Sequence, residues 1–228
     1  MAYNNRIMFL EALASGSLIL ASADTASWCK PERAPVVRVG LQAPAPVGDY
    51  GKTMVQLEKF QIDTVSPYGV HVETHVGGLT KGDVEISHTY QTAGLRRGDL
   101  TCLWLDQVKV VIRLKQTVYV AKEYAPGTCM YKSVWEHEHK HVRTDREILN
   151  KYRPIYEKEI KRYLSTFPVV GPVTVREEGA AQQKLGEQIE YVISGLTEKM
   201  ESERARRQQG VDTLEEYQRV ARMCRGKR

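Results

Sequence analysis

The sequence predicts an α+β fold, in which an antiparallel sheet is followed by a long helix and then by C-terminal helices. Three observations support this prediction. Apolar and polar residues alternate with a period near two between Thr53 and Tyr124. Apolar residues then recur at helical spacings from Cys129 to Leu164. A second, more polar helical pattern runs through residues 176–209, so the strands precede the helices.

The predicted sheet consists of short segments joined by short connections. Such connections favour antiparallel pairing, because parallel strands need long crossovers. The predicted strands are residues 70–76, 84–90, 100–105, 108–114 and 117–121. The turns between them are expected at Gly77–Gly78, between Gly94 and Gly98, near Asp106–Gln107 and at Lys115–Gln116.

The first long helix is expected from about Cys129 to Leu164. Pro126–Gly127 breaks the chain just upstream, and Thr128 is suited to cap the N-terminus of the helix. Pro154 either kinks this helix or ends it near Arg153, because proline cannot donate the helical hydrogen bond.

The C-terminal part of the chain is predicted to be helical. Residues 167–175, rich in Pro, Gly and Val, form a linker or a short strand. A long polar helix follows over residues 176–209, and Gly210 ends it. Residues 212–217 resemble a capped helix start, which leads into a short final helix that reaches Cys224. The apolar stripe of the long helix is Leu185, Ile189, Val192, Ile193, Leu196 and Met200.

The N-terminus has the features of a secretory signal. Arg6 supplies the positive flank, residues 7–21 the apolar region, and Ala21–Ala23 an A-x-A cleavage site. The apolar run is too short for a comfortable transmembrane helix. We therefore expect a mature chain that begins near Asp24, is periplasmic or extracellular, and does not span the membrane after cleavage.

The length of 228 residues suits one domain with extensions. The net charge of +5 is mild, and the basic runs lack the interleaved aromatic residues of a single-strand-binding surface, so no nucleic-acid partner is expected. The predicted parts are a signal peptide (1–23), an extended Pro-rich lead-in (24–52), a domain with the motif described below (53–166), and a helical extension that packs on the same domain (167–228).

The cysteines indicate disulfides. None of them forms a CxxC pair, which argues against a cysteine zinc site. An even number in an exported chain predicts two disulfides. Three pairings are open, of which we favour Cys102 with Cys129 and Cys29 with Cys224.

The chain contains an HExxH motif at His137, Glu138 and His141. Two histidines four residues apart project from one helix face, so both imidazoles can reach one tetrahedral Zn²⁺. Glu138 is then placed to take a proton from a metal-bound water and return it to a leaving amine. His139 lies about 200° around the helix from His137, at roughly 100° per residue, and is not predicted to be a ligand.

The third zinc ligand is not apparent from spacing. Asp145 continues the face of His141, but it lies about 12 Å along the axis from His137, at 1.5 Å per residue. It is predicted either to accept the free ring N–H of His141 or to become the third ligand if the helix bends. The sequence also leaves open Glu157, Glu159, Glu177, Glu178, Glu187, Glu190, His71, His75 and His88.

A sheet followed by an HExxH helix resembles the zincin metallopeptidases. Residues 131–142 around the motif look like those of secreted bacterial proteins described as predicted zinc-dependent proteases. The resemblance covers roughly residues 68–152. It implies that His137 and His141 bind zinc and that Glu138 is the general base. The chain lacks the HExxHxxGxxH extension, so the resemblance does not identify the third ligand.

The sequence therefore predicts an exported zinc metallopeptidase that acts on a peptide or protein substrate. Two other hypotheses stay open, namely a non-catalytic envelope binding protein with a structural or vestigial metal site, and a hydrolase of non-peptide amide bonds. A closed four-ligand site would indicate a structural metal, because a catalytic zinc keeps one position open. The candidates for stabilising the oxyanion are Tyr131, Tyr152, His139 and a strand histidine.

Overall fold

The computed structural model describes residues 28–60, 76–166 and 169–224. The predicted signal peptide (1–23) and nearly all of the predicted strand 70–76, including His71 and His75, lie outside the described residues. The described elements are, in order, β1 (Val36–Gln42), β2 (Val47–Asp49), α1 (Met54–Leu57), β3 (Gly78–Arg97), β4 (Leu100–Val120), α2 (Cys129–Thr166), β5 (Val170–Thr174), the 3-10 helix η1 (Val175–Glu177), α3 (Glu178–Gln209) and α4 (Leu214–Met223).

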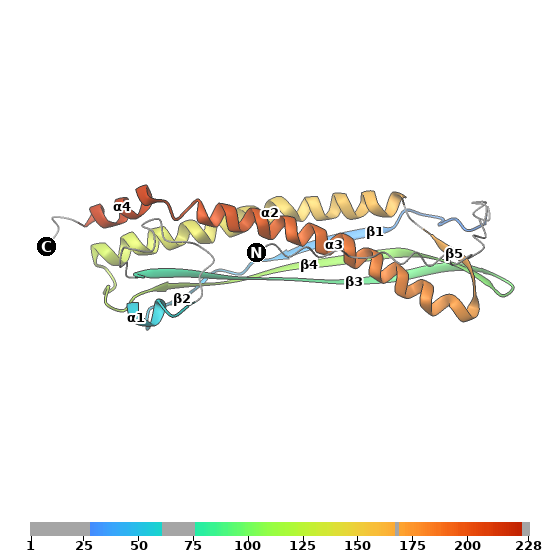
Figure 1. Cartoon of the computed structure of the whole chain (residues 1–228), viewed down its shortest axis with the longest axis horizontal. Helices are drawn as coiled ribbons and strands as arrows, with labels where there is room; N and C mark the ends of the chain where they lie inside the picture. Colours follow the sequence, from blue (N-terminus) through green and yellow to red (C-terminus); the bar gives the residue numbers. More distant parts are fainter. Residues whose placement is uncertain (1–27, 61–75, 167–168, 225–228) are drawn as a thin grey trace, which may run out of the picture.

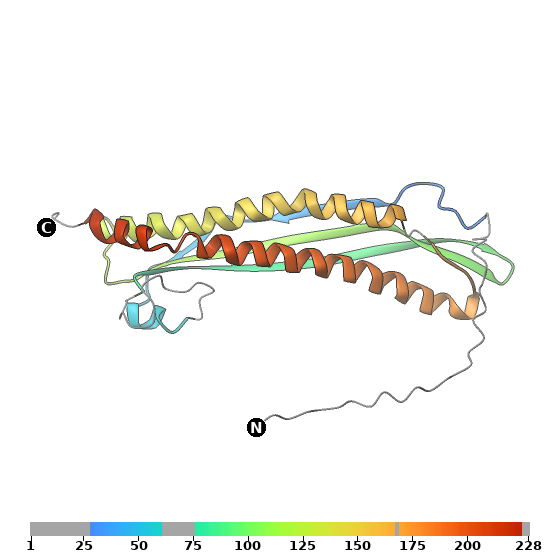
Figure 2. The same ribbon diagram turned by 45° about the horizontal axis from the view of Figure 1, so that its top comes forward.

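The described part of the chain forms two elongated layers, a twisted sheet and a layer of helices on one of its faces (Figure 1). The long helices α2 and α3 run side by side along the sheet, as both ribbon views show (Figure 2). The short helix α4 continues beyond α3 and lies beside the N-terminal part of α2. The predicted α+β class is therefore correct.

Strand β4 is the centre of the sheet. On one edge it pairs along its whole length with β3, with which it forms a hairpin. On the other edge it pairs in succession with β5, β1 and β2. Among the described strands, none pairs with the outer edge of β3.

The prediction of an antiparallel sheet is wrong, because β1 and β2 both run parallel to β4. Only β3 and β5 are antiparallel to it. The parallel strands come from the Pro-rich lead-in, which we expected to be extended but not to belong to the sheet. The rule that short connections favour antiparallel pairing correctly describes the β3–β4 hairpin, but it does not apply to strands that enter the sheet from a distant segment.

Two predicted turns are not turns, since residues 100–120 form one strand of 21 residues. Asp106 is an extra residue in β4, because consecutive residues of β3 pair with Gln107 and then with Leu105. Its carboxylate accepts hydrogen bonds from Arg33. Gln116 is buried against α2. The chain reverses at Gly98–Asp99, where Gly98 has a φ of 58° that favours glycine.

The alternation in β4 separates a core face from an open face. From Val108 to Val120 the even-numbered residues are buried under the helices, and the odd-numbered ones are partly or fully exposed. The helices contribute Ile148, Leu149, Tyr156 and Ile160 from α2 to the same core. The stripe predicted for α3 also packs there, with Leu185, Ile189, Ile193, Leu196 and Met200 buried and Val192 partly buried.

The helices agree well with the predicted ranges. α2 spans 38 residues and continues through Pro154 to Thr166. The Thr128 hydroxyl accepts a hydrogen bond from the Tyr131 N–H at 3.2 Å, as expected of a cap. None of the described helices is both long enough and apolar enough to cross a membrane.

Two disulfides are present, and the favoured pairing is wrong. Cys29 is bonded to Cys102, which ties the lead-in to the start of β4. Cys129 is bonded to Cys224, which ties the first residue of α2 to the residue after α4. Each pair has a Cα–Cα distance of 5.6 Å. The pairing depends on which chain ends lie together in space, and cysteine spacing does not contain that information.

The packing of α3 can be tested by changing Ile189 to Ala. Ile189 is fully buried, so we expect the free energy of unfolding to fall by about 2–5 kcal/mol, measured by chemical denaturation. The control is Tyr191→Ala on the same helix, where the side chain is 82% exposed and a change within about 0.5 kcal/mol is expected. Equal effects of the two changes would contradict the packing of α3 on this core.

Candidate metal centre

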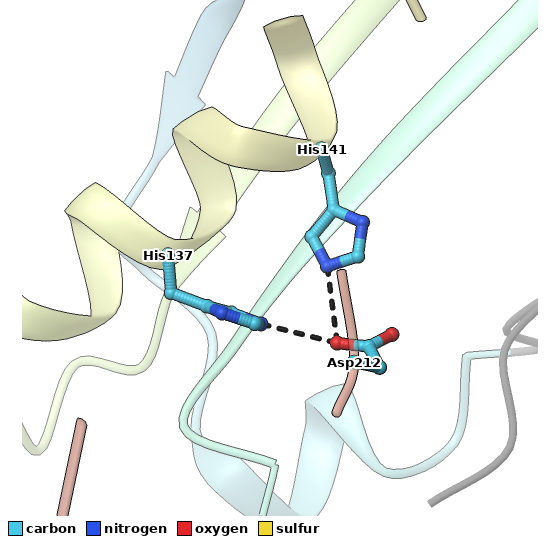
Figure 3. Close-up of side chains that lie close together, drawn as sticks. All are labelled: His137, His141 and Asp212. Carbon is cyan, nitrogen blue, oxygen red and sulfur yellow. Dashed lines mark hydrogen bonds and ion pairs between the residues drawn. The ribbon is translucent and has the colours of Figure 1, made fainter. Parts of the chain in front are cut away.

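The HExxH motif lies in the N-terminal third of α2, where that helix meets the loop between α3 and α4. His137 and His141 project from one face of α2, and their rings lie 5.1 Å apart. Both rings direct Nε2 toward the same oxygen, Oδ1 of Asp212 in that loop (Figure 3). Each of the two nitrogens is 3.2 Å from it.

This arrangement can hold one metal ion. The ligand atoms of His137, His141 and Asp212 all lie within 4.8 Å of one another. In a tetrahedral zinc site with bonds of 2.0–2.1 Å, neighbouring ligand atoms are roughly 3.3 Å apart, close to the two observed nitrogen–oxygen distances. Two imidazoles and a carboxylate are also a donor set that zinc uses.

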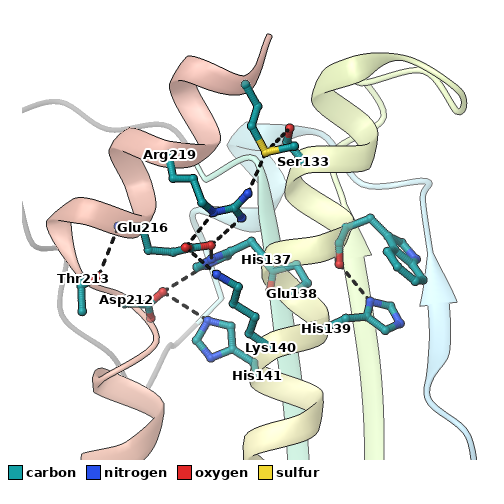
Figure 4. A network of polar contacts seen from close by, with 12 residues as sticks. Ser133, His137, Glu138, His139, Lys140, His141, Asp212, Thr213, Glu216 and Arg219 are labelled. Atoms are coloured by element: carbon teal, nitrogen blue, oxygen red, sulfur yellow. Dashed lines mark hydrogen bonds and ion pairs between the residues drawn. The ribbon is translucent and has the colours of Figure 1, made fainter.

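The outer nitrogen of His137 contacts Glu216 of α4. Its Nδ1 lies 3.3 Å from Glu216 Oε1, which can only accept a hydrogen bond while the carboxylate is ionised. Arg219 donates to both oxygens of that carboxylate, at 2.7 and 2.8 Å, and Lys140 forms an ion pair with it (Figure 4). Burial raises the pKa of Glu216, but the hydrogen bonds from Arg219, Lys140 and His137 outweigh it and lower the pKa to about 2. Glu216 therefore keeps the proton of His137 on Nδ1 and leaves Nε2 free for a metal.

The outer nitrogen of His141 contacts Gln208 of α3. Its Nδ1 lies 2.7 Å from Gln208 Oε1. The amide nitrogen of Gln208 donates to the Asp145 carboxylate at 2.5 Å and to the His141 carbonyl at 3.2 Å. Since both of these partners only accept, the amide oxygen of Gln208 must face His141. In the neutral ring, His141 then carries its proton on Nδ1, so that its Nε2 can bind a metal, as in His137.

Neither ring nitrogen of His141 contacts Asp145, and Asp145 is not among the three grouped ligands, so it takes neither of the two roles predicted for it. It is 1% exposed, and it reaches His141 only through Gln208. Its other partners are Arg204, whose Nε donates at 2.8 Å, and Gln116, whose amide donates at 3.1 Å. Arg204 also donates to the carbonyl of Gly82 on β3 at 2.8 Å, and a Cβ at Gly82 would collide with the Asp145 carboxylate.

The charges around His141 favour its protonated form when no metal is bound. Burial lowers the pKa of His141, but the hydrogen bond to Asp212 and the charges of Glu138 and Asp212 outweigh it and raise the pKa to about 9. A metal ion must therefore displace a proton, so binding is expected to weaken as the pH falls.

Glu138 faces the sheet rather than solvent. It is 4% exposed, and the Thr80 hydroxyl lies 2.9 Å from its Oε2 and from its main-chain oxygen. Gly78 on β3 leaves room for it, because a Cβ there would lie 2.7 Å from Oε1. Burial raises the pKa of Glu138, whereas His137, His141 and the Thr80 hydrogen bond lower it, and burial dominates.

The other candidates lie elsewhere in the structure. His139 stacks on Trp135, with ring centroids 3.6 Å apart, and its Nδ1 lies 2.9 Å from the Trp135 carbonyl. His88 Nε2 lies 3.2 Å from a carboxylate oxygen of Glu190. Tyr152 donates to Lys199 and Glu203 of α3. The remaining carboxylates suggested by the sequence, Glu157, Glu159, Glu177, Glu178 and Glu187, are outside the grouped ligands.

Sequence reasoning missed Asp212 as a candidate ligand, because residues 212–217 resemble the capped start of a helix. The cap of α4 is Thr213, whose hydroxyl accepts a hydrogen bond from the Glu216 N–H at 3.2 Å. A cap and the carboxylate before it look alike in sequence. The signal in the sequence was a second residue able to cap, Thr213, because a cap at Thr213 allows Asp212 to take another role.

Helix α4 is attached mainly by polar contacts. Of the residues of α4, all of which are described, only Glu216 is buried. Leu214 and Met223 are 43% and 38% exposed. With so little apolar burial, the position of α4 depends on the Glu216 contacts and on the disulfide from Cys129 to Cys224.

Comparisons with protein-family models, curated proteins and solved structures give no match for this chain. The assignment of the centre therefore depends on its geometry alone.

The double change Cys129→Ser/Cys224→Ser is expected to weaken zinc binding. Without the disulfide α4 is docked for a smaller fraction of the time, and if that fraction falls to about a tenth, the apparent affinity falls about tenfold. Competition with a chromogenic chelator measures this. The control, Cys29→Ser/Cys102→Ser, removes the disulfide near the hairpin end of the sheet and should lower stability without this loss of affinity. An unchanged zinc affinity in the first variant would show that α4 does not need its tether.

The change Gln208→Met is expected to weaken zinc binding about tenfold to a hundredfold, the usual effect of removing a partner of a ligating histidine. Methionine keeps the length of the side chain but cannot accept the Nδ1 proton of His141. The same chelator competition measures the loss. The control is Gln183→Met, an exposed position of α3 whose amide donates to Glu187. If both variants bind zinc like the parent, Gln208 does not orient His141.

Proposed function

We propose that the chain is an exported zinc-dependent peptidase, with His137, His141 and Asp212 as zinc ligands and Glu138 as general base. The observation that carries the proposal is the convergence of two Nε2 atoms on one buried carboxylate oxygen, next to a glutamate on the same helix turn. The two disulfides are compatible with an oxidising compartment such as the periplasm or the extracellular space.

A zinc ion in this centre would polarise the scissile carbonyl and lower the pKa of a bound water to about 7. The protein supplies three ligands, which is the usual number in catalytic zinc sites. The outer contacts from Glu216 and Gln208 hold both imidazoles in the ligating form. They thus favour a fixed geometry, which catalysis by positioned groups requires.

Glu138 supplies the acid–base step. Its raised pKa makes the carboxylate a better proton acceptor than an exposed glutamate. Glu138 would accept a proton from the attacking water and return it to the leaving amine. The Thr80 hydroxyl is a positioning group, since it donates to the carboxylate and fixes its orientation.

The outer edge of β3 supports a peptide as substrate. Gly78 and Thr80, which contact Glu138, belong to this strand, and none of the described strands pairs with its outer edge. An extended peptide could add to that edge by main-chain hydrogen bonds, which would bring its carbonyl groups close to Glu138.

The burial of the site favours a second function, a non-catalytic binding protein with a structural metal. The side chains of His137, His141 and Asp212 are only 10%, 13% and 4% exposed. Catalysis would require substrate to reach this centre, whereas a structural metal requires no access. The two functions share their ligands and differ in the role of Glu138.

The change Glu138→Gln separates them. For the peptidase, we expect kcat to fall by a factor of about 10² to 10⁴, because the general base is lost, while zinc content stays near that of the parent. Hydrolysis of casein-derived peptides and zinc content by atomic emission are the measurements. The control is Glu157→Gln, a carboxylate further along the same helix whose ion pair is with Lys161, which should keep full activity.

Activity that survives in Glu138→Gln would contradict the proposed mechanism. Stoichiometric zinc without hydrolysis of any peptide in the parent protein would favour the structural metal. Asp212→Ala should lose zinc in either case, so it tests the ligand set independently of catalysis.

A further inference from the structure

A groove of about 380 Å³ lies beside the metal centre, between the outer face of α2 and helix α4. Its wall on α2 consists of Trp135, Glu136, His139, Lys140 and Arg143, and Arg219 closes it from α4. The groove combines a stacked aromatic pair, Trp135 and His139, with three cationic side chains. Lys140 and Arg219 also hold Glu216 at the metal centre, whereas Trp135, His139 and Arg143 have no contact with the grouped ligands among the described residues.

The three cations are not equally engaged. Arg219 places two of its N–H groups on Glu216, and Lys140 pairs with the same carboxylate. Arg143 is exposed, and within the described residues it has no hydrogen bond or ion pair. It therefore presents a guanidinium that is free to bind an anion. Lys140 and Arg219 remain 35% and 36% exposed and add to the positive potential.

The groove is coupled to the metal centre through Glu216. Lys140 and Arg219 both hold this carboxylate, and Glu216 holds His137. Lys140 and Arg219 thus link the wall of the groove, through Glu216, to the candidate metal ligand His137 (Figure 4).

We propose that this groove is a carboxylate subsite, which binds an acidic side chain of a peptide with Arg143 as its main contact. A guanidinium fork matches a carboxylate in two-point geometry. The stacked rings of Trp135 and His139 offer an apolar surface to the methylene groups of glutamate. The proposal deepens the proposed peptidase function and rests on it for the identity of the peptide as substrate.

The test compares two peptides on the full chain loaded with zinc. One is a blocked pentapeptide with two glutamates, and the other has glutamine at both positions. Binding is measured by calorimetry on the Glu138→Gln variant, so that cleavage does not interfere. We expect tighter binding of the glutamate peptide and a loss of this preference at high ionic strength, since salt screens exposed charges.

Arg143→Gln should weaken binding of the glutamate peptide about three- to five-fold, which is the effect of one exposed charge pair, and leave the glutamine peptide unchanged. Arg38→Gln is the matched control, because Arg38 is an exposed arginine of β1, away from the groove. Arg143→Glu should abolish the preference for the glutamate peptide. Equal binding of both peptides, or equal effects of the changes at Arg143 and Arg38, would overturn the subsite. Complete displacement of the glutamate peptide by equimolar inorganic phosphate would also overturn it, since the groove would then be a phosphate site.

Hydrolysis by the wild-type chain distinguishes this proposal from the peptidase function. If neither peptide is cleaved but the glutamate peptide still binds through Arg143, the peptidase function fails and the subsite stands. If both peptides are cleaved at equal kcat/KM and Arg143→Gln changes neither, the subsite alone fails.

Discussion

The buried carboxylate of Asp145 is the contact on which the arrangement of the site depends. Leaving such a charge without partners costs about 3–5 kcal/mol, so its partners must converge on it. They come from two elements: Gln116 lies on β4, and Arg204 and Gln208 lie on α3. Their convergence fixes where α3 lies along α2 and brings residue 208 next to His141. Gly82 makes this possible, because a side chain there would occupy the space of the carboxylate.

Helix α4 and the loop before it supply the remaining residues of the centre. The helix carries Glu216, and the loop carries Asp212, yet the helix contributes almost no apolar surface to the core. Its position is therefore set by the contacts of Glu216 with Lys140 and His137 of α2 and by the disulfide to Cys129. A metal ion bound to Asp212 would strengthen the same contacts, so metal binding and the docking of α4 are expected to support each other.

The helices could be predicted closely from the sequence, because their signals are local. The cap at Thr128 and the stripe from Leu185 to Met200 are patterns of neighbouring residues, and both appear as expected. The strands were less predictable. Asp106 and Gln116 look like turn residues, but one is an extra residue paired with Arg33 and the other is a buried partner of Asp145. Whether a polar residue interrupts a strand depends on what lies opposite it.

By itself, the sequence determined the helical frame of the site, that is, two histidines and a glutamate at fixed spacing on one helix, because helix geometry relates residues a few positions apart. Only the tertiary structure brought Asp212 to the two histidines and decided the parallel strands and the disulfide pairing. Asp212 lies 71 residues beyond His141, and Cys224 lies 95 beyond Cys129. Contacts over such distances are set by how the layers pack, and no local periodicity records which of many carboxylates or thiols will arrive at the same point.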